Sequence, residues 1–308
     1  MARAGWTRNY GRRAVHNFAE AVAIASVAVA ESADEPPTVY VTPHVLSQKI
    51  AGSFAQGCGG KVVQLPEAAQ ERNYDFLAAT RELMRRGFIV TGPMAAYGIL
   101  RGCGELIATA KMMKHDYWHI DNGYVRQSNH EAGDLSGYYR ITKNGFQTTI
   151  CEDRPPDRWN ETNINVISLW NKKGSDILVI PPSRFVAEYQ RIDPQIWVAS
   201  VEAEIKKRTD RPIRVKVFKG GLKELLPTTH CVITHESMAA LHALIGGTPA
   251  IALGEHCIGE LSWTWKDLEY PRYFDRGQVN RLCNWLGYNQ FRLDEIADGT
   301  AWRMLNES

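Results

Sequence analysis

The chain has 308 residues, which is enough for two domains of ordinary size, and its 44% hydrophobic residues can fill two cores. The formal net charge of +2 is too near zero to require a nucleic-acid partner, although it leaves room for a local basic patch. This composition excludes a disordered chain, and no segment has the roughly eighteen consecutive apolar residues of a membrane span.

The six cysteines are far apart and show neither a CxxC pair nor a zinc-like spacing, so they predict reduced thiols in a cytoplasmic protein. One segment imitates a secretion signal. Arg12 and Arg13 precede the apolar residues 21–30, which end in Ala28-Val29-Ala30. Because that run lacks leucine and phenylalanine, we interpret it as an alanine-rich first helix and expect no membrane partner.

Strands and helices alternate through the first half of the chain, as a parallel doubly wound sheet requires. The predicted elements are a strand at Thr38–Thr42, a helix at Ser47–Gln56, a strand at Lys61–Leu65, a helix at Tyr74–Arg86, a strand with its turn at Gly87–Pro93 and a helix at Met94–Gly102.

The segment Asp116–Tyr124 is predicted as a strand that runs into an Asn-Gly turn. It brings His119, Asp121, Asn122 and Tyr124 to a strand terminus, which is where α/β proteins gather catalytic side chains. The same Asp-Asn-Gly residues can also serve the turn alone.

From Arg126 to Trp159 the composition shifts toward Asn, Gly, Tyr, Arg and Asp. Tyr138, Arg140 and Lys143 are interleaved there, and basic and aromatic side chains together can grip a nucleic-acid strand by phosphate contact and base stacking. A hairpin packed on the edge of the domain explains the same composition. We place the end of the N-terminal domain at residue 160.

The second half begins with a predicted strand at Ile177–Ile180, followed by Ser183 and Arg184. A helix at Trp197–Arg208, a half-exposed strand that contains Lys216, and a short helix at Leu222–Leu226 come next. Ser183, Arg184 and Lys216 are candidates for holding the phosphates of a nucleotide.

The stretch from Cys231 to Cys257 predicts a buried strand, an alanine-rich helix and a second strand. The unpaired amides and the dipole at a helix start stabilise anions, so a phosphate could bind there. Ser237 would either cap this helix or bind a phosphate oxygen. An ordinary strand-helix-strand unit with a capped helix explains the same residues.

This stretch resembles the C-terminal half of GT-B glycosyltransferases, which hold a nucleotide-sugar diphosphate with a line of the type (T/S)-H-x-S-x-x-A-x-x-A-L-x-x-G-x-P. The matching residues are Thr234, His235, Ser237, Ala240, Ala243, Leu244, Gly247 and Pro249. The resemblance implies an α/β fold of two facing Rossmann-like domains: an acceptor domain at 1–160, a nucleotide-sugar-binding domain at 161–265, and C-terminal helices at 266–308 that pack back on the first domain. It implies donor contacts from Thr234, His235, Glu236, Ser237, Met238 and Gly247.

A hydroxyl acceptor would need a general base, and we expect Asp121 in this role, with His44 as the second choice. The chain has no DxD motif, which favours a metal-independent reaction with no cofactor and a nucleotide sugar, in our expectation UDP-linked, as co-substrate. The candidate acceptor contacts are His119, Asn122, Tyr124, Tyr138, Arg140 and Lys143.

The tail residues Gln278–Gly287 and Leu293–Gly299 resemble phage-encoded proteins of DNA base modification. That resemblance implies an acceptor such as 5-hydroxymethylcytosine in phage DNA, in the cytoplasm of the infected host. The central motif also resembles capsule-polysaccharide enzymes, so a saccharide acceptor stays open. A UDP-sugar epimerase and a non-catalytic protein that binds sugar nucleotides or nucleic acid are the further alternatives.

Overall fold

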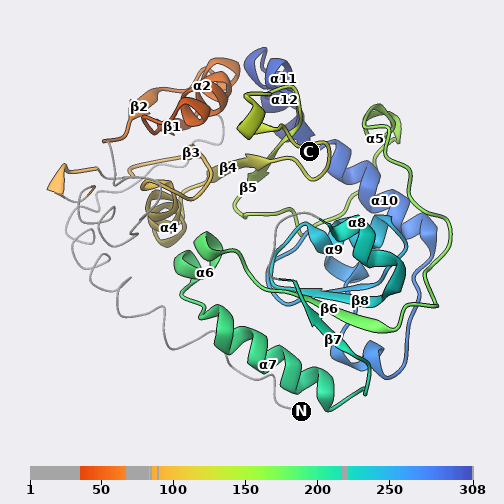
Figure 1. Cartoon of the computed structure of the whole chain (residues 1–308). Helices are drawn as coiled ribbons and strands as arrows, with labels where there is room; N and C mark the ends of the chain where they lie inside the picture. The colour runs from red at the N-terminus through yellow and green to blue at the C-terminus, as the bar shows by residue number, and fades with distance from the viewer. Residues whose placement is uncertain (1–34, 67–82, 84, 89, 217–220, 307–308) are drawn as a thin grey trace. The chain divides into compact units, whose positions relative to one another are not determined.

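The computed structural model describes residues 35–66, 83, 85–88, 90–216 and 221–306. They form two compact units (Figure 1). The first takes the chain up to Asp121, then Phe185–Ile192 and Asp294–Ser308, and the second takes Asn122–Arg184 and Asp193–Leu293. The predicted helix at residues 21–30 and nearly all of the predicted helix at 74–86 lie outside the described residues.

Four parallel strands carry the first unit, in the spatial order β4-β3-β1-β2. They are β1 (Thr38–Val41), β2 (Val62–Gln64), β3 (Met94–Tyr97) and β4 (Tyr117–Asn122). Helices α2 (Val45–Cys58) and α4 (Cys103–Met113) complete the alternation. The strands at 38–42 and 61–65 and the helix at 47–56 are confirmed.

The predicted helix at Met94–Gly102 is wrong, because its first four residues are strand β3. Met94, Ala95 and Ala96 are fully buried between neighbouring strands. A short run of apolar residues suits either a buried strand or a buried helix, so its periodicity could not distinguish the two. The segment ends at Gly98, whose φ of 68° lies in the left-handed region.

The end of the chain packs within the first unit. Helix α12 (Thr300–Asn306) lies on α2, where Trp302 meets Phe54 and Trp118 with ring centroids 5.9 and 5.0 Å apart. Helix α11 (Leu293–Ala297) precedes it, and α10 (Arg276–Gly287) belongs to the second unit. The return to the first unit therefore begins at Asp294 and not at residue 266.

The second unit is built on a parallel sheet in the order β7-β6-β8-β9. Its strands are β6 (Asp176–Ile180), β7 (Ile213–Val215), β8 (Thr229–Thr234) and β9 (Ala250–Ala252). Its helices are α5 (Asp157–Glu161), α7 (Pro194–Lys206), α8 (Leu222–Leu225), α9 (Ala239–Ile245) and α10; α6 (Arg184–Gln190) lies almost wholly in the first unit.

Both faces of this sheet are covered, because successive side chains of a strand point to opposite faces. Leu178 and Val232 pack with α9 and α10 on one face. Val179 and Ile233 pack with α7 on the other, so α7 and α9 lie on opposite sides of the sheet (Figure 1). The predicted α/β class is confirmed. The facing arrangement implied by the GT-B resemblance stays a prediction.

Strand β5 (Tyr139–Lys143) pairs antiparallel with β10 (Gln290–Phe291), a strand far from it in the sequence. The chain enters the second unit at Asn122, and the predicted boundary at residue 160 falls inside that unit. All six cysteines are free, and five of them are buried. Among the described residues, no helix is long and apolar enough to cross a membrane.

His230 is a core residue of β8 that is only 2% exposed. Its ring meets Trp263 edge-on, with centroids 5.5 Å apart, and neither ring nitrogen has a hydrogen-bond partner among the described residues. Burial, followed by the nearby charge of Arg211, lowers the pKa of His230 to about 4.

We expect His230→Phe to weaken the acid sensitivity of the protein. An unfolded histidine binds a proton near pH 6.5 and the folded His230 does not, so stability falls as the pH drops from about 6.5 toward about 4. The variant should shrink the difference in unfolding free energy between pH 7 and pH 5 by roughly 2 kcal/mol in urea titrations. An undiminished difference would contradict this assignment.

Candidate functional site

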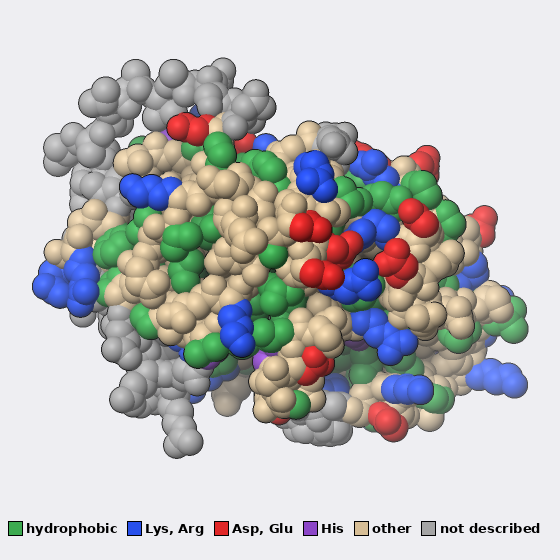
Figure 2. All heavy atoms as spheres, turned by 90° about the horizontal axis from the view of Figure 1, so that it is seen from above, with side chains coloured by type: hydrophobic (Ala, Val, Ile, Leu, Met, Phe, Trp, Pro, Cys, Tyr) green, Lys and Arg blue, Asp and Glu red, His purple; other side chains and the backbone are tan. Residues whose placement is uncertain are grey.

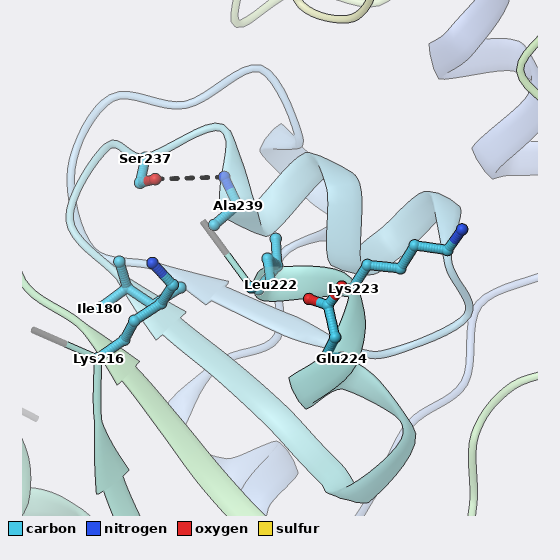
Figure 3. Close-up of a pocket in the computed structure, with 8 residues that line it drawn as sticks. Ile180, Lys216, Leu222, Lys223, Glu224, Ser237 and Ala239 are labelled. Atoms are coloured by element: carbon cyan, nitrogen blue, oxygen red, sulfur yellow. Dashed lines mark hydrogen bonds between the residues drawn. The ribbon is translucent and has the colours of Figure 1, made fainter. Parts of the chain in front are cut away.

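A pocket of about 310 Å³ lies at the carboxyl edge of the second unit's sheet (Figure 3). Ile180 ends β6, Lys216 directly follows β7, and Ser237 lies three residues after β8. The complete lining is Ile180, Lys216, Gly221, Leu222, Lys223, Glu224, Ser237 and Ala239. Open parallel sheets bind ligands at this edge, and the volume is at the lower end of the roughly 300–1,000 Å³ typical of ligand sites.

The lining combines a positive charge with apolar walls. Lys216 is partly buried and rises beside Ile180 toward the side that carries Ser237, whereas the amine of Lys223 turns away (Figure 3). The ammonium group of Lys216 makes its side of the lining favourable for an anion, and Glu224 adds one carboxylate. Leu222 and Ala239 add apolar surface for an organic group.

Ser237 lies directly before Met238, the N-cap residue of helix α9, and its side chain contacts the first turn. Its Oγ accepts a hydrogen bond from the backbone N–H of Ala239 at 3.3 Å (Figure 3), and Thr234 Oγ1 accepts one from the N–H of Ser237 at 3.4 Å. Both distances exceed the usual 2.9–3.0 Å or so of a good N–H···O bond. These weak bonds can be exchanged for bonds to a ligand oxygen at little cost, so capping and ligand binding are compatible at Ser237.

The other predicted donor contacts of this loop do not line the pocket. His235 Nε2 lies 3.5 Å from Glu236 Oε1, and its ring stands edge-on to Trp197. Burial lowers the pKa of His235, and the charge of Glu236 opposes that shift. Met238 packs against the hydrophobic core beside α9, and Thr234 is fully buried.

Ser183 and Arg184 follow β6 as predicted, but both are exposed and neither lines the pocket. Among the predicted donor contacts, only Lys216 and Ser237 line it. The short helix α8 supplies Leu222, Lys223 and Glu224, and its position in the sequence was predicted without a ligand contact assigned to these three residues.

Gly247 is a turn residue and not a contact of this pocket. It lies beyond the C-terminal end of α9, opposite the end that carries Ser237, at a φ of 80°. A Cβ added there would overlap the carbonyl oxygen of Leu169. The glycine is therefore required by the backbone path and by close packing.

We expect Gly247→Ala to destabilise the protein by about 2–4 kcal/mol, because left-handed backbone and steric overlap both penalise a side chain there. Gly277→Ala in α10 is the matched control, since its Cβ would meet only ordinary contacts at 3.5 Å or more. Urea unfolding measures both variants. Equal stabilities for the two would refute this role of Gly247.

The two candidate bases lie at the carboxyl edge of the first unit's sheet. His44 precedes α2 just after β1, and Asp121 is near the end of β4. Strand β3 separates β1 from β4, with Tyr40, Ala96 and His119 in register. Two strand spacings of about 4.8 Å place the two strands about 10 Å apart. Both side chains are partly exposed.

Two of the basic and aromatic residues expected to contact an acceptor at 138–146 are buried. Tyr138 and Arg140 are 7% and 8% exposed, and Arg140 Nη1 donates a hydrogen bond to the carbonyl oxygen of Asn122 at 3.1 Å. Lys143 is exposed at the end of β5. Tyr138 directly precedes β5 and Arg140 lies in it, and the burial of both side chains keeps them from contacting an acceptor in solvent.

Two further acceptor candidates are core residues. His119 is 2% exposed, and Tyr124 is fully buried with its hydroxyl oxygen accepting a hydrogen bond from the N–H of Thr148 at 3.3 Å. Burial raises the pKa of Tyr124. The strand terminus predicted from Asp116–Tyr124 is present, but its side chains serve mainly the fold.

Two residues that the sequence did not single out contact the loop after β8. Gln147 Nε2 donates to the carbonyl oxygen of Glu236 at 3.0 Å, and His256 Nε2 lies 2.9 Å from the carbonyl oxygen of Ser237. His256 follows closely after β9, which is a usable signal. No sequence signal points to Gln147, because its contact joins distant parts of the chain.

No protein-family model matches the chain, and no curated protein does. Among solved structures, the chain is similar to the beta Kdo 2,4 transferase of Thermosulfurimonas dismutans KpsC, with 11% identity, a TM-score of 0.44, and 88% of this chain and 98% of that chain covered. It is also similar to the beta Kdo 2,7 transferase of the same organism's KpsC, with 9% identity, a TM-score of 0.40, and coverages of 88% and 99%. Both likenesses are too distant to assign a donor or an acceptor to this chain.

Proposed function

We propose that the protein is a glycosyltransferase that takes a sugar from a nucleotide-sugar donor and passes it to a hydroxyl acceptor. The observation that carries this proposal is the pocket at the carboxyl edge of β6, β7 and β8, in which Lys216 and Ser237 meet an apolar wall. Such a combination suits a ligand with a phosphate at one end and an organic ring at the other.

In this proposal Lys216 binds the donor phosphates. Its ammonium group attracts the negative charge that builds up on the departing nucleoside phosphate, and stabilisation of that charge lowers the barrier. The amide of Ala239 and the hydroxyl of Ser237 exchange their weak mutual bond for bonds to phosphate oxygens. Glu224 can accept hydrogen bonds from sugar hydroxyls.

The transfer itself needs one base. The acceptor oxygen attacks the anomeric carbon of the donor sugar, the bond from that carbon to the phosphate oxygen breaks, and its electron pair leaves with the nucleoside phosphate. A carboxylate or imidazole takes the acceptor proton as the new bond forms. We propose Asp121 as this base and His44 as the alternative, with no metal ion required.

The acceptor is proposed as a hydroxyl group of either a hydroxymethylated base in DNA or a saccharide. The inward orientation of Tyr138 and Arg140 gives no support to DNA contact by residues 138–146. On the face drawn in Figure 2, the described acidic and basic side chains are interspersed and do not form one basic area. Neither observation favours a DNA acceptor over a saccharide.

The test is to incubate the protein with a panel of nucleotide sugars and either hydroxymethylated DNA or oligosaccharides, followed by mass spectrometry of both products. Sugar on an acceptor together with released nucleoside phosphate supports transfer. Isomerised donor without an acceptor would indicate an epimerase. Donor that is bound but never consumed would indicate a binding protein.

A further inference from the structure

Four consecutive carbonyl oxygens, from Thr234 to Ser237, are held by other parts of the second unit. The donors, in order, are Leu253 N at 2.9 Å, Gly254 N at 2.9 Å, Gln147 Nε2 at 3.0 Å and His256 Nε2 at 2.9 Å, and the carbonyl oxygen of Ser237 also accepts a hydrogen bond from Ala240 N at 3.1 Å. The first two are backbone groups that follow β9. Gln147 and His256 donate from their side chains, so the orientation of the carbonyls of Glu236 and Ser237 depends in part on residue identity.

The orientation of Gln147 is fixed by its own contacts. Its Oε1 accepts a hydrogen bond from the N–H of Cys257 at 3.0 Å, which leaves Nε2 to face the carbonyl oxygen of Glu236. Glu255 Oε1 accepts hydrogen bonds from the N–H groups of Phe146 and Gln147 at 3.0 and 3.3 Å. Gln147 is 5% exposed, so water cannot easily replace it.

The protonation of His256 is fixed in the same way. Its Nδ1 accepts a hydrogen bond from the N–H of Ile258 at 3.2 Å, so the proton of the neutral ring is on Nε2, which donates to the carbonyl oxygen of Ser237. The ring is 4% exposed, and burial lowers its pKa to about 4. His256 is therefore a neutral donor at physiological pH.

Holding these carbonyls also sets the direction of the amides. In a planar trans peptide the N–H points opposite to the preceding C=O, so the N–H groups of Ser237 and Met238 point away from Gln147 and His256 respectively. A carbonyl that rotated toward a bound phosphate would repel it. The two side chains thus keep carbonyl dipoles turned away from the ligand that Lys216 attracts.

We propose that Gln147 and His256 are positioning residues that preset the loop Thr234–Ser237 for a phosphate-bearing ligand, an inference that rests on the proposed function. They touch the loop's backbone and not the ligand. Their loss should therefore weaken phosphate binding while leaving the sheet and the lysines of the pocket in place.

The test compares His256→Leu and His256→Gln with His230→Leu. Glutamine can present a donor where Nε2 lies, and leucine cannot. His230 is the matched control because it is an equally buried neutral histidine of the same unit with no hydrogen bond to this loop. The probes are uridine diphosphate and inorganic pyrophosphate, with dissociation constants from calorimetry and backbone amide exchange of Ser237 and Met238.

We expect His256→Leu to weaken binding of both probes by about tenfold and to speed exchange of the two amides, because a buried hydrogen bond is lost. His256→Gln should return to within about threefold of the wild type, and His230→Leu should bind as the wild type does. If His256→Leu does not fold, Gln147→Met gives the same test at the neighbouring carbonyl.

Wild-type binding that is unchanged in His256→Leu would overturn the positioning role while leaving the proposed function intact. A wild type that binds neither probe would contradict the proposed function. Amide exchange in His256→Leu then still shows whether His256 holds the loop, and exchange equal to that of His230→Leu would overturn the inference independently.

Discussion

Asp121→Asn is expected to lower the turnover of sugar transfer by about 10²–10⁴-fold, because an amide cannot take the acceptor proton. The dissociation constant of the donor should stay unchanged, since Asp121 is not among the residues that line the phosphate pocket. Single-turnover kinetics with saturating donor measures the first quantity, and calorimetry with the donor alone measures the second.

Asp116→Asn is the matched control for this prediction. Asp116 directly precedes β4, at the opposite edge of the same sheet from Asp121, so its replacement should leave turnover within about threefold of the wild type. If Asp121→Asn keeps full turnover while His44→Ala loses it, His44 is the base. Full turnover in both variants would refute the assignment of the base to this edge.

Lys216→Ala is expected to raise the dissociation constant of the donor by about 10–150-fold, which corresponds to the roughly 1.5–3 kcal/mol of a hydrogen bond to a charged group. Added salt should weaken binding to the wild type more than binding to the variant, because the removed charge is the one that salt screens. Calorimetric titrations at two ionic strengths give both values.

Lys206→Ala, at the exposed end of α7 in the same unit, removes a lysine that does not line the pocket and should leave donor affinity within about twofold of the wild type. The donor affinity of Lys223→Ala should lie between those of Lys216→Ala and Lys206→Ala, since the amine of Lys223 turns away from the pocket in Figure 3. Equal affinities for Lys216→Ala and Lys206→Ala would remove Lys216 from the binding site.

The second unit's central strand, helix and strand could be predicted because their signals are local. The β-branched run of β8, the alanine-rich α9 and the Gly-Thr-Pro turn each act within a few residues. Strand β3 could not be predicted, since its four residues Met94–Tyr97 carry no period that separates a strand from a helix. Its burial between β1 and β4 makes this segment a strand.

Tyr138 and Arg140 show why burial of some predicted acceptor contacts could not be foreseen. Their basic and aromatic pattern is typical of an exposed binding surface, but both side chains are buried beside or within β5, which pairs with β10 from near the end of the chain. No local sequence pattern predicts that strand pairing. Gln147 was missed for the same reason, because its hydrogen bond to the backbone of Glu236 joins residues far apart in the sequence.

Within the candidate site, Lys216 and Ser237 could be predicted from their places at the ends of predicted strands, which a parallel sheet brings to one edge. The sequence places Gly247 correctly in the turn that ends the alanine-rich helix, but the donor contact that the resemblance implied for it does not line the pocket. Its left-handed φ and its contact with Leu169 show a purely structural need.

The most direct measurement is a crystal structure of the protein with a bound nucleoside diphosphate. We expect phosphate oxygens within hydrogen-bond reach of Lys216 Nζ and of the hydroxyl or amides at Ser237–Ala239, with the ring system against Leu222 or Ile180. A nucleotide bound with its phosphates away from Lys216 and Ser237 would contradict it.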